Sequence, residues 1–205
     1  MFSRAVGSGL GEENGQDGEV TFAFIRHGQT DWNRDLRMQG ASDIPLNDTG
    51  RMQAAEAVAG LRNTQWDAIV SSPLSRARET AEIIARGLSI PLGPAYDNLV
   101  ERNYGEAEGA TAEDIAERWP DQPFPGLERI DLVIGRGIAA LEQISADYGD
   151  ANVVIVCHGT LIRHTLQKLA GRKFDAIRNG SVAKFDRVDS GWHVLTVNDE
   201  AVVTL

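Results

Sequence analysis

The chain has 205 residues, of which 42% are hydrophobic and 24% are charged, which is ordinary for a soluble globular protein. Its formal net charge of −10 makes nucleic acid and anionic membranes unfavourable partners, and no apolar run is long enough to cross a bilayer. This length predicts one domain with a sizeable core. An anionic substrate would need a local cationic pocket in an otherwise acidic protein.

The N-terminal residues 1–19 are rich in Gly, Glu, Ser and Asn and show no hydrophobic periodicity. We therefore expect a flexible tail there, ahead of a single domain over residues 20–205. The tail has no apolar segment typical of a secretory signal. The single cysteine, Cys157, cannot form an internal disulfide, which fits a reducing compartment. These features predict a cytoplasmic protein, and the sequence leaves its oligomeric state open.

From residue 20 onward, predicted strands alternate with predicted helices. Apolar runs predict strands at residues 20–25, 68–71, 96–100 and 153–157, and apolar periodicity predicts helices at residues 48–60, 73–88, 112–119, 127–148 and 161–169. Residues 182–187 and 193–197 predict a terminal hairpin around Asp189-Ser190-Gly191. We expect a three-layer α/β/α fold with a mainly parallel central sheet and a C-terminal antiparallel hairpin.

Local signals at the strand ends refine this prediction. Ser72 is predicted as the N-cap of the second helix, with Pro73 at its first position. Gly28 follows the first strand and would let a ligand approach the backbone. The helix N-termini after Ser72 and after His158 would present backbone N–H donors to an anion.

Polar side chains follow all four of the predicted strands. Arg26 and His27 follow the first, Arg76 stands in the helix after the second, Glu101 follows the third and His158 the fourth. Because ligands bind at the carboxyl ends of parallel strands, we expect these side chains to surround one cleft. Imidazole is a nucleophile toward phosphorus, arginines hold phosphate oxygens, and a carboxyl group can protonate a leaving oxygen. The set predicts phosphoryl transfer.

Four motifs in the chain resemble, in the correct order, those of the histidine phosphatase superfamily, the family of cofactor-dependent phosphoglycerate mutase and its phosphatase relatives. They are Arg26-His27-Gly28, Ser71-Ser72-Pro73-Leu74-Ser75-Arg76-Ala77, Glu101-Arg102-Asn103-Tyr104-Gly105 and His158-Gly159. Arg-His-Gly alone would be weak, as short motifs are. Four motifs spread over residues 20–188 make the resemblance specific.

The resemblance implies a role for each residue. His27 would be the nucleophile that becomes phosphohistidine, and Arg26, Arg76 and His158 would form the phosphate pocket around it. Glu101 would serve as general acid and general base. The implied substrate-binding residues are Asn33, Gln39, Gly40, Gly159 and Thr160. The pair Gln39-Gly40 stands where the mutases usually have Thr-Gly, and Thr160 stands where they usually have Asn.

The segment between the acid and the last histidine favours the phosphatase branch. The family's mutases resemble one another in a long insertion there, with a lysine and a pair of arginines. Here residues 102–157 contain no lysine and no Arg-Arg pair. A short segment would leave a phosphohistidine open to water, which predicts a metal-independent phosphomonoesterase. The run from Glu101 to Gly105 is close to the mutase form, so phosphoglycerate mutase-type transfer is the alternative.

A non-catalytic module that binds a phospholigand is a further alternative, although binding would not need both a nucleophile and an acid. Glu106 and Glu108 are rival candidates for the acid, and Cys157 is expected as a buried strand residue. No His-x-x-x-His or Cys-x-x-Cys spacing indicates a metal, so we expect no metal and no other cofactor. The expected partner is a small phosphorylated metabolite, with Arg37 and Arg102 as candidate ligands for a second anionic group.

Overall fold

The computed structural model describes residues 20–121, 123–189 and 191–203, and the tail predicted for residues 1–19 lies outside them. One sheet has the strand order β3-β2-β4-β1-β5-β6. Its strands are β1 (Val20–Arg26), β2 (Ala68–Ser71), β3 (Leu92–Ala95), β4 (Val153–Cys157), β5 (Val182–Val188) and β6 (Gly191–Val194). A separate small ladder pairs β7 (Thr196–Val197) with β8 (Glu200–Ala201).

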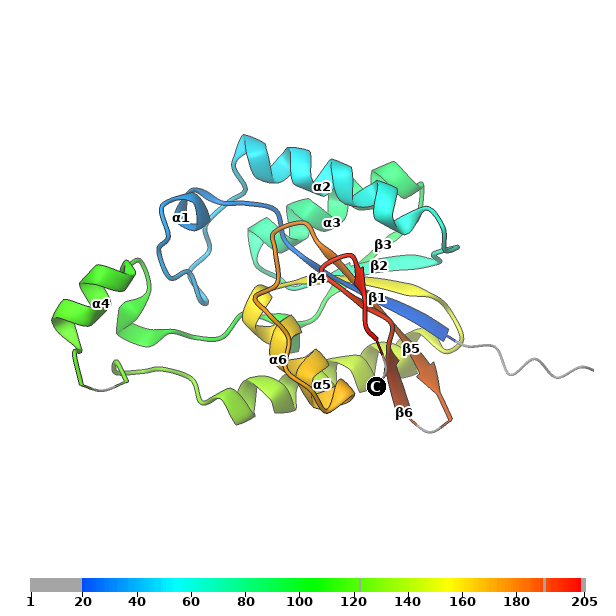
Figure 1. The fold of residues 1–205 in the computed structure, drawn as a ribbon. Coiled ribbons are helices and arrows are strands. Elements are labelled where there is room, and N and C mark those ends of the chain that lie inside the picture. The colour runs from blue at the N-terminus through cyan, green and yellow to red at the C-terminus, as the bar shows by residue number, and fades with distance from the viewer. Residues whose placement is uncertain (1–19, 122, 190, 204–205) are drawn as a thin grey trace, which may run out of the picture.

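The sheet is mainly parallel, as predicted. Strands β3, β2, β4 and β1 run parallel, whereas β5 pairs antiparallel with β1 and β6 pairs antiparallel with β5. Helices α2 (Asp48–Leu61) and α3 (Ser75–Leu88) cover one face, and α5 (Ile130–Tyr148) and α6 (Gly159–Ala170) cover the other (Figure 1). The predicted three-layer α/β/α fold with a C-terminal antiparallel hairpin is confirmed.

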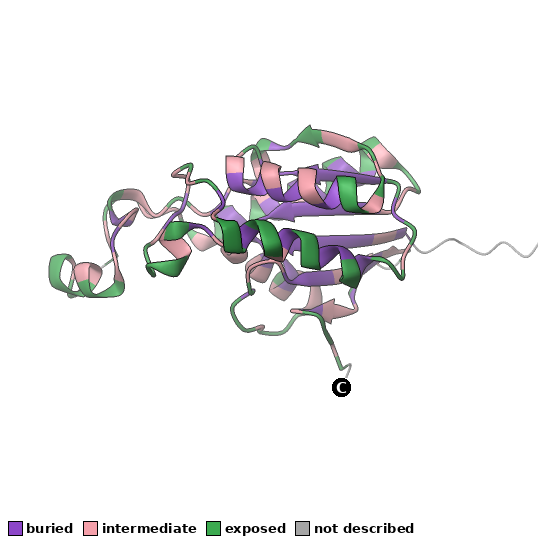
Figure 2. Ribbon diagram, turned by 90° about the horizontal axis from the view of Figure 1, so that it is seen from above, coloured by how far each residue is buried: buried purple, intermediate pink, exposed green. Residues whose placement is uncertain are grey.

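The central strands β1 and β4 are buried on both faces of the sheet. Phe22 and Phe24 of β1 lie in the apolar cluster under α5 and α6, whereas Ala23 and Ile25 lie in the cluster under α2 and α3. This is the period-two alternation of an extended strand. It explains why such strands are uninterrupted apolar runs in the sequence. Figure 2 looks onto the face covered by α2 and α3 and shows buried strands behind helices that carry exposed residues.

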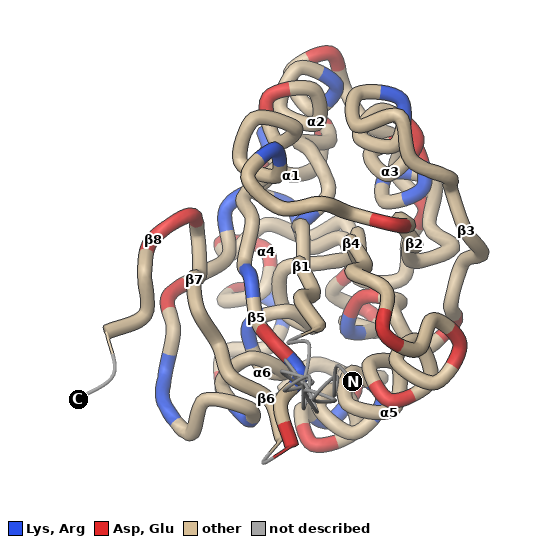
Figure 3. The backbone as a smooth tube through the Cα atoms, turned by 90° about the vertical axis from the view of Figure 1, so that its right-hand side faces the viewer, with Lys and Arg blue, Asp and Glu red and all other residues tan. Residues whose placement is uncertain are grey.

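The two central strands carry almost no charge. Strand β4 carries no Asp, Glu, Lys or Arg, and β1 carries its first at Arg26, its last residue. Figure 3 shows acidic and basic segments interspersed over the outer helices. No helix among the described residues is long and apolar enough to span a lipid bilayer. Arg26 therefore brings a cation directly to the edge of the apolar core.

The carboxyl edge of the parallel strands carries the loops that build the site. Helices α1 (Asp31–Arg34) and α4 (Ala112–Arg118) lie beyond this edge (Figure 1). Two 3₁₀ turns, Asp97–Leu99 and Gly105–Ala107, connect β3 to α4. No residue of α4 is buried. The crevice outside the ends of β1, β2 and β4 is where open α/β sheets bind ligands.

The prediction of a strand at residues 96–100 is wrong. Strand β3 occupies Leu92–Ala95 instead, and a 3₁₀ turn follows it. β3 is an edge strand with its last two residues exposed, and Pro94 is tolerated there because one side of an edge strand makes no ladder hydrogen bonds. The Gly-Pro sequence lacks the apolar run that marks a buried strand. Tyr96 and Leu99 are buried without being strand residues.

The predicted start of the second helix is also wrong. α3 begins at Ser75 with Leu74 at the N-cap, and not at Pro73 after a Ser72 cap. Asp43, from the loop before α2, accepts hydrogen bonds from the Ser75 N–H (2.8 Å) and hydroxyl (2.7 Å). Asp43 thereby satisfies a helix N-terminus that is distant in sequence, so no local signal could reveal it.

Other boundaries shift by a few residues. α5 begins at Ile130 and not at residue 127, because Leu127 pairs with Tyr104 in an isolated bridge. The hairpin's second strand covers Gly191–Val194 and not residues 193–197, since Thr196–Val197 pairs with β8. Helix α1 within residues 28–47, which were expected as a loop, and strand β8 were not predicted; apart from β3, the other helices and strands match predicted elements.

Candidate active site

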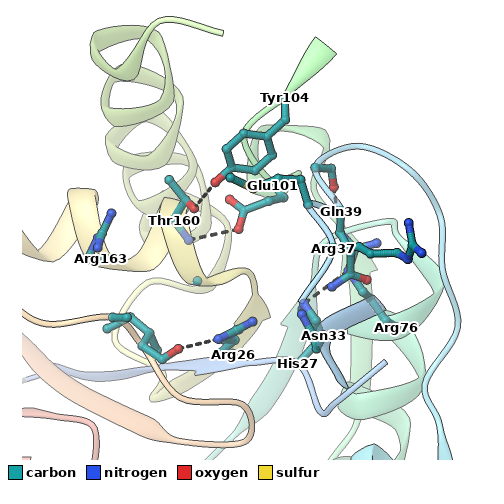
Figure 4. A pocket seen from close by; sticks show the side chains of 15 residues that line it. Arg26, His27, Asn33, Arg37, Gln39, Arg76, Glu101, Tyr104, Thr160 and Arg163 are labelled. Carbon is teal, nitrogen blue, oxygen red and sulfur yellow. Dashed lines mark hydrogen bonds between the residues drawn. The ribbon is translucent and has the colours of Figure 1, made fainter. Parts of the chain in front are cut away.

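The carboxyl edge of the sheet opens onto a pocket of about 200 Å³, shown in Figure 4. Of the predicted catalytic and substrate-binding residues, all but His158 line this pocket, and His158 is fully buried beside His27. The predicted residues that line it are Arg26, His27, Asn33, Gln39, Gly40, Arg76, Glu101, Gly159 and Thr160. The fold therefore gathers the four motifs into one place.

His27 follows β1 directly and is buried. Its Nδ1 lies 2.7 Å from the carbonyl oxygen of Gly28. Because a carbonyl oxygen only accepts, Nδ1 carries the ring proton and Nε2 keeps a lone pair. Arg76 donates from its Nε to this Nε2 over 3.2 Å. The imidazole is thus held with an unprotonated nitrogen directed toward a guanidinium.

Arg76, in the first turn of α3, is a fully buried cation. Its Nη1 and Nη2 donate to the carbonyl oxygens of Ser42 (2.7 Å) and Gly40 (2.8 Å). None of the ion pairs among the described residues includes it. Burial lowers the pKa of this guanidinium to about 10, so it stays protonated near neutral pH. A buried cation without a carboxylate partner is suited to binding an anion.

His158 stands at the N-cap of α6, with its ring centroid 5.1 Å from that of His27. Its Nε2 lies 2.8 Å from the hydroxyl oxygen of Ser72, so Ser72 orients this imidazole and does not cap α3. The Nδ1 of His158 is buried and has no hydrogen-bond partner among the described residues. A buried polar atom that the protein leaves unsatisfied is costly, and it marks a place where a bound ligand can supply the partner.

The segment after α6 holds Arg26 and His27, and no sequence motif pointed to it. Arg26 donates from Nη1 to the carbonyl oxygen of Ile177 (2.6 Å), and Asn179 donates from Nδ2 to the carbonyl oxygen of His27 (2.9 Å). The Nε of Arg26 is buried and lacks a partner in the described part of the chain. A Cβ at Gly159 would lie 3.2 Å from this atom. Two buried polar atoms without a partner therefore belong to Arg26, which lines the pocket, and to His158, which packs beside His27.

Glu101 lies in the pocket although the strand predicted before it does not exist. Its carboxylate accepts hydrogen bonds from the backbone N–H groups of Arg102 (2.8 Å), Thr160 (3.0 Å) and Leu161 (3.1 Å). The last two belong to the N-terminus of α6, which the sequence predicted as a donor to the substrate. In the structure, this helix terminus positions the carboxylate of Glu101 instead.

Glu106 and Glu108, the two other candidates for the general acid, lie in different surroundings from Glu101. Glu106 is exposed. The carboxylate of Glu108 accepts hydrogen bonds from the N–H groups of Ala41 and Ser42, each at 2.9 Å, and from the Ser42 hydroxyl. Glu108 thus fixes the loop whose carbonyl oxygens hold Arg76. The sequence placed Glu108 close to the acid but did not indicate this supporting contact.

Two glycines near the site are required by close packing of the protein itself. Gly40 has φ of +57°, and a Cβ there would lie 2.1 Å from Oε1 of Glu108. A Cβ at Gly28 would lie 2.1 Å from the carbonyl oxygen of Gly50, in the first turn of α2. The interpretation of Gly28 as an opening for a ligand is therefore wrong, because this glycine admits a neighbouring helix.

The other predicted binding residues make specific contacts at the pocket wall. The side-chain oxygen of Asn33 accepts hydrogen bonds from Thr30 N and Asn179 Nδ2, each over 3.2 Å. Gln39 accepts one from the Thr30 hydroxyl over 2.8 Å. The Thr160 hydroxyl lies 2.7 Å from that of Tyr104, which also lines the pocket. These contacts leave the Nδ2 amino group of Asn33 as its donor toward the pocket.

Burial keeps both site histidines neutral. Desolvation, with Arg76 and Arg26 nearby, holds the pKa of the His27 imidazole well below its ordinary value. Desolvation, with Arg76 and His27 nearby, lowers the pKa of His158 in the same way. Burial raises the pKa of the Cys157 thiol, so this strand residue stays protonated, as an inert buried cysteine should. The site therefore holds two neutral imidazoles between two arginine cations.

The lowered histidine pKa values predict that the protein loses stability in mild acid. Below the ordinary histidine pKa, His27 and His158 bind protons in the unfolded chain. In the folded state they stay unprotonated, because their pKa values are lowered. The free energy of unfolding should fall by up to about 1.4 kcal/mol per pH unit for each histidine, from about pH 6.5 downward. Urea unfolding at about pH 7.5, 6 and 5 measures this slope. His158→Gln should reduce the slope and the exposed His193→Gln should not, whereas a stability that stays constant to about pH 5 would contradict the prediction.

The sequence model of the histidine phosphatase superfamily (branch 1) matches residues 22–200 of the chain. The chain belongs to this superfamily. The predicted family membership, with its phosphatase and mutase-like relatives, is therefore confirmed.

Individual relatives agree with this membership in sequence and in fold. Over 179 residues the chain is 35% identical to an uncharacterized phosphatase of Bacillus subtilis, PhoE, covering 85% of this chain and 92% of the relative. The structure of Bacillus stearothermophilus YhfR superposes with a TM-score of 0.79 at 27% identity, over 89% of this chain and 98% of that chain. A mycobacterial glucosyl-3-phosphoglycerate phosphatase, in complex with VO3, gives a TM-score of 0.77 at 26% identity, over 87% and 99%.

Metal ligands are not gathered at this site. Among the residues that the structure describes, no group of three His, Cys, Asp or Glu side chains is placed to hold a metal ion. The predicted catalytic groups that converge here are His27, His158, Arg26, Arg76 and Glu101.

Proposed function

We propose that this histidine phosphatase superfamily member is a metal-independent phosphomonoesterase that acts on a small phosphorylated metabolite. The observation that carries the proposal is the geometry at His27. Its Nδ1 proton is held by the Gly28 carbonyl, so that Nε2 carries no proton and its lone pair accepts a hydrogen bond from the Nε of Arg76. Arg26, which lines the pocket, and His158, whose ring packs against that of His27, each carry a buried polar atom that the described residues leave unsatisfied. This arrangement suits attack on a phosphoryl group.

In the first step, Nε2 of His27 attacks phosphorus and the bond from phosphorus to the leaving oxygen breaks. Arg26, Arg76 and His158 hold the phosphoryl oxygens, where charge is concentrated in the transition state. Glu101, which enters this step in its protonated form, gives that proton to the leaving oxygen, which departs as an alcohol. The Gly28 carbonyl stabilises the positive charge that the phosphorylated imidazole acquires, because Nδ1 keeps its proton.

In the second step, water attacks the phosphorus of phosphohistidine. Glu101, now a carboxylate, accepts a proton from this water, and the bond between Nε2 and phosphorus breaks. Inorganic phosphate leaves, and His27 returns to its neutral form. The three backbone N–H groups that hold Glu101 keep its carboxylate at the pocket through both steps.

The segment between Glu101 and β4 supports hydrolysis over mutase-type transfer. Of residues 102–157, Tyr104 is the one described residue that lines the pocket, and α4 contributes no buried residue. A mutase must shield its phosphohistidine from water until the phosphoryl group returns to the sugar acid. A pocket with so little cover from this segment favours transfer to water.

Turnover of p-nitrophenyl phosphate in the presence of EDTA tests the proposal. The wild-type protein should release p-nitrophenol and inorganic phosphate at the same rate with and without the chelator. Loss of turnover in EDTA, restored by a divalent cation, would contradict metal independence. Exchange of phosphoglycerate isomers without net hydrolysis would favour the mutase alternative. Binding of inorganic phosphate without either activity would favour a phospholigand-binding module.

A further inference from the structure

A third orphaned polar atom lies at the pocket, away from His27. The Nε of Arg163 is buried without a hydrogen-bond partner among the described residues, and the side chain lines the pocket. Its Nη2 lies 3.2 Å from the Nε2 of His164. None of the ion pairs in the described ranges includes Arg163. Arg163 is therefore a cation with unused donors at the pocket wall.

Helix α6 sets the distance between this cation and the phosphoryl site. His158 stands at the N-cap, Gly159 and Thr160 line the pocket, and Arg163 follows. Five residues of α-helix rise about 7 Å, so Arg163 lies about that far along the axis from His158. Figure 4 shows Arg163 on α6 beyond Thr160, on the side away from Arg76. This position suits a group on the leaving part of a substrate and not the transferred phosphoryl group.

The charge of the pocket exceeds what one phosphate requires. Arg26 and Arg76 already balance the roughly two negative charges of a phosphomonoester. Arg37 and Arg163 add two further cations to the lining, and Glu101 is the one carboxylate among the lining residues. The pocket thus has an excess of positive charge, although the whole chain has 30 acidic and 20 basic residues. A second anionic group on the substrate would match the additional positive charge.

Arg163 fits a second anion better than the two arginines that the sequence suggested. Arg37 is exposed and donates to the carbonyl oxygen of Gly109 over 2.7 Å. Arg102 does not line the pocket; its Nε donates to the Glu128 carbonyl oxygen over 2.8 Å, and its guanidinium lies 5.7 Å from the centroid of the Tyr104 ring. Arg163 has the buried, unsatisfied donor that a ligand would complete.

We propose that Arg163 binds a second anionic group of the substrate, so that the enzyme prefers phosphomonoesters whose leaving group carries a carboxylate or another phosphate. The planar guanidinium can bind either anion through two parallel hydrogen bonds. This inference rests on the proposed function, because the phosphoryl group must occupy the His27 end of the pocket.

Pairs of substrates that differ in the second acidic group test this inference. They are 3-phosphoglycerate against glycerol 3-phosphate, and fructose 1,6-bisphosphate against fructose 6-phosphate. The wild type should have a kcat/KM about 10-fold or more higher for the acidic member of at least one pair. For that member, Arg163→Gln should lose about 10- to 100-fold in kcat/KM, mainly through KM, and for the neutral member less than about threefold.

Two variants serve as controls. Arg163→Lys keeps the charge and should restore part of the preference for the acidic member, because lysine binds an anion as a point charge. Arg86→Gln removes an exposed arginine of α3 that does not line the pocket, and it should leave every rate unchanged.

Three results would overturn the inference. The wild type could have equal kcat/KM for both members of both pairs, or Arg163→Gln could lose kcat/KM equally for both members. The third is a loss of kcat/KM for the acidic member alone in Arg37→Gln and not in Arg163→Gln. p-Nitrophenyl phosphate has no second acidic group and separates this inference from the proposed function. If it is hydrolysed and the preference is absent, the inference about Arg163 fails alone. If none of these esters is hydrolysed, the proposed function fails and the inference fails with it.

Discussion

Replacing His27 with alanine is expected to reduce phosphatase turnover by at least about 10⁴-fold. The variant lacks the nitrogen that attacks phosphorus, while Arg26 and Arg76 still line the pocket and His158 is unchanged. Binding of a phosphate ester should therefore persist although covalent transfer stops. The measurement is steady-state hydrolysis of p-nitrophenyl phosphate, with direct calorimetric titration of inorganic phosphate into the variant to report the remaining affinity of the pocket.

Direct detection of the intermediate sharpens this prediction. Phosphohistidine withstands alkali and breaks down in acid, so an alkaline quench during turnover of a radiolabelled ester should leave label on the wild type and none on His27→Ala. The exposed His193→Ala is the matched control and should behave like the wild type. Because His27 is buried, circular dichroism must first show that His27→Ala is folded. A folded variant that keeps more than about one hundredth of the wild-type rate would exclude His27 as the nucleophile.

The sequence was most informative where each residue is determined by its own segment. Strands β1 and β4 could be predicted because burial on both faces demands an uninterrupted apolar run. The polar residues that end them, Arg26, His27 and His158, could be placed at one edge because parallel strands end together. The family resemblance then supplied positions between the main elements, such as Asn33 and Gln39, which the hydrophobic pattern alone does not distinguish.

Features that depend on contacts distant in the sequence could not be predicted. Asp43 caps α3 from a loop about 30 residues away, and the segment around Ile177 and Asn179 holds Arg26 and His27 across the sheet edge. Glu108 supports Arg76 through an intervening loop. A single sequence shows such residues as ordinary polar positions, because their partners are identified only once the chain is folded.

Replacing Glu101 with alanine is expected to slow the enzyme by an amount that depends on the leaving group. An alkoxide is a poor leaving group and needs a proton, so hydrolysis of an alkyl phosphate should fall by about 10²- to 10⁴-fold. p-Nitrophenolate departs readily without a proton, so phosphorylation of His27 by p-nitrophenyl phosphate should be much less affected. Hydrolysis of phosphohistidine still requires the base, and the phosphorylated enzyme should accumulate.

A rapid-mixing experiment with p-nitrophenyl phosphate shows this difference. Glu101→Ala should release one equivalent of p-nitrophenol in a burst and then turn over slowly, while the exposed Glu106→Ala should match the wild type. Glu101 also accepts three backbone hydrogen bonds, including two from the N-terminus of α6, so its loss could act through that helix alone. In that case the hydrolysis rates of the alkyl phosphate and of p-nitrophenyl phosphate would fall equally, and no burst would appear. A displaced α6 disturbs the phosphoryl site whichever alcohol leaves.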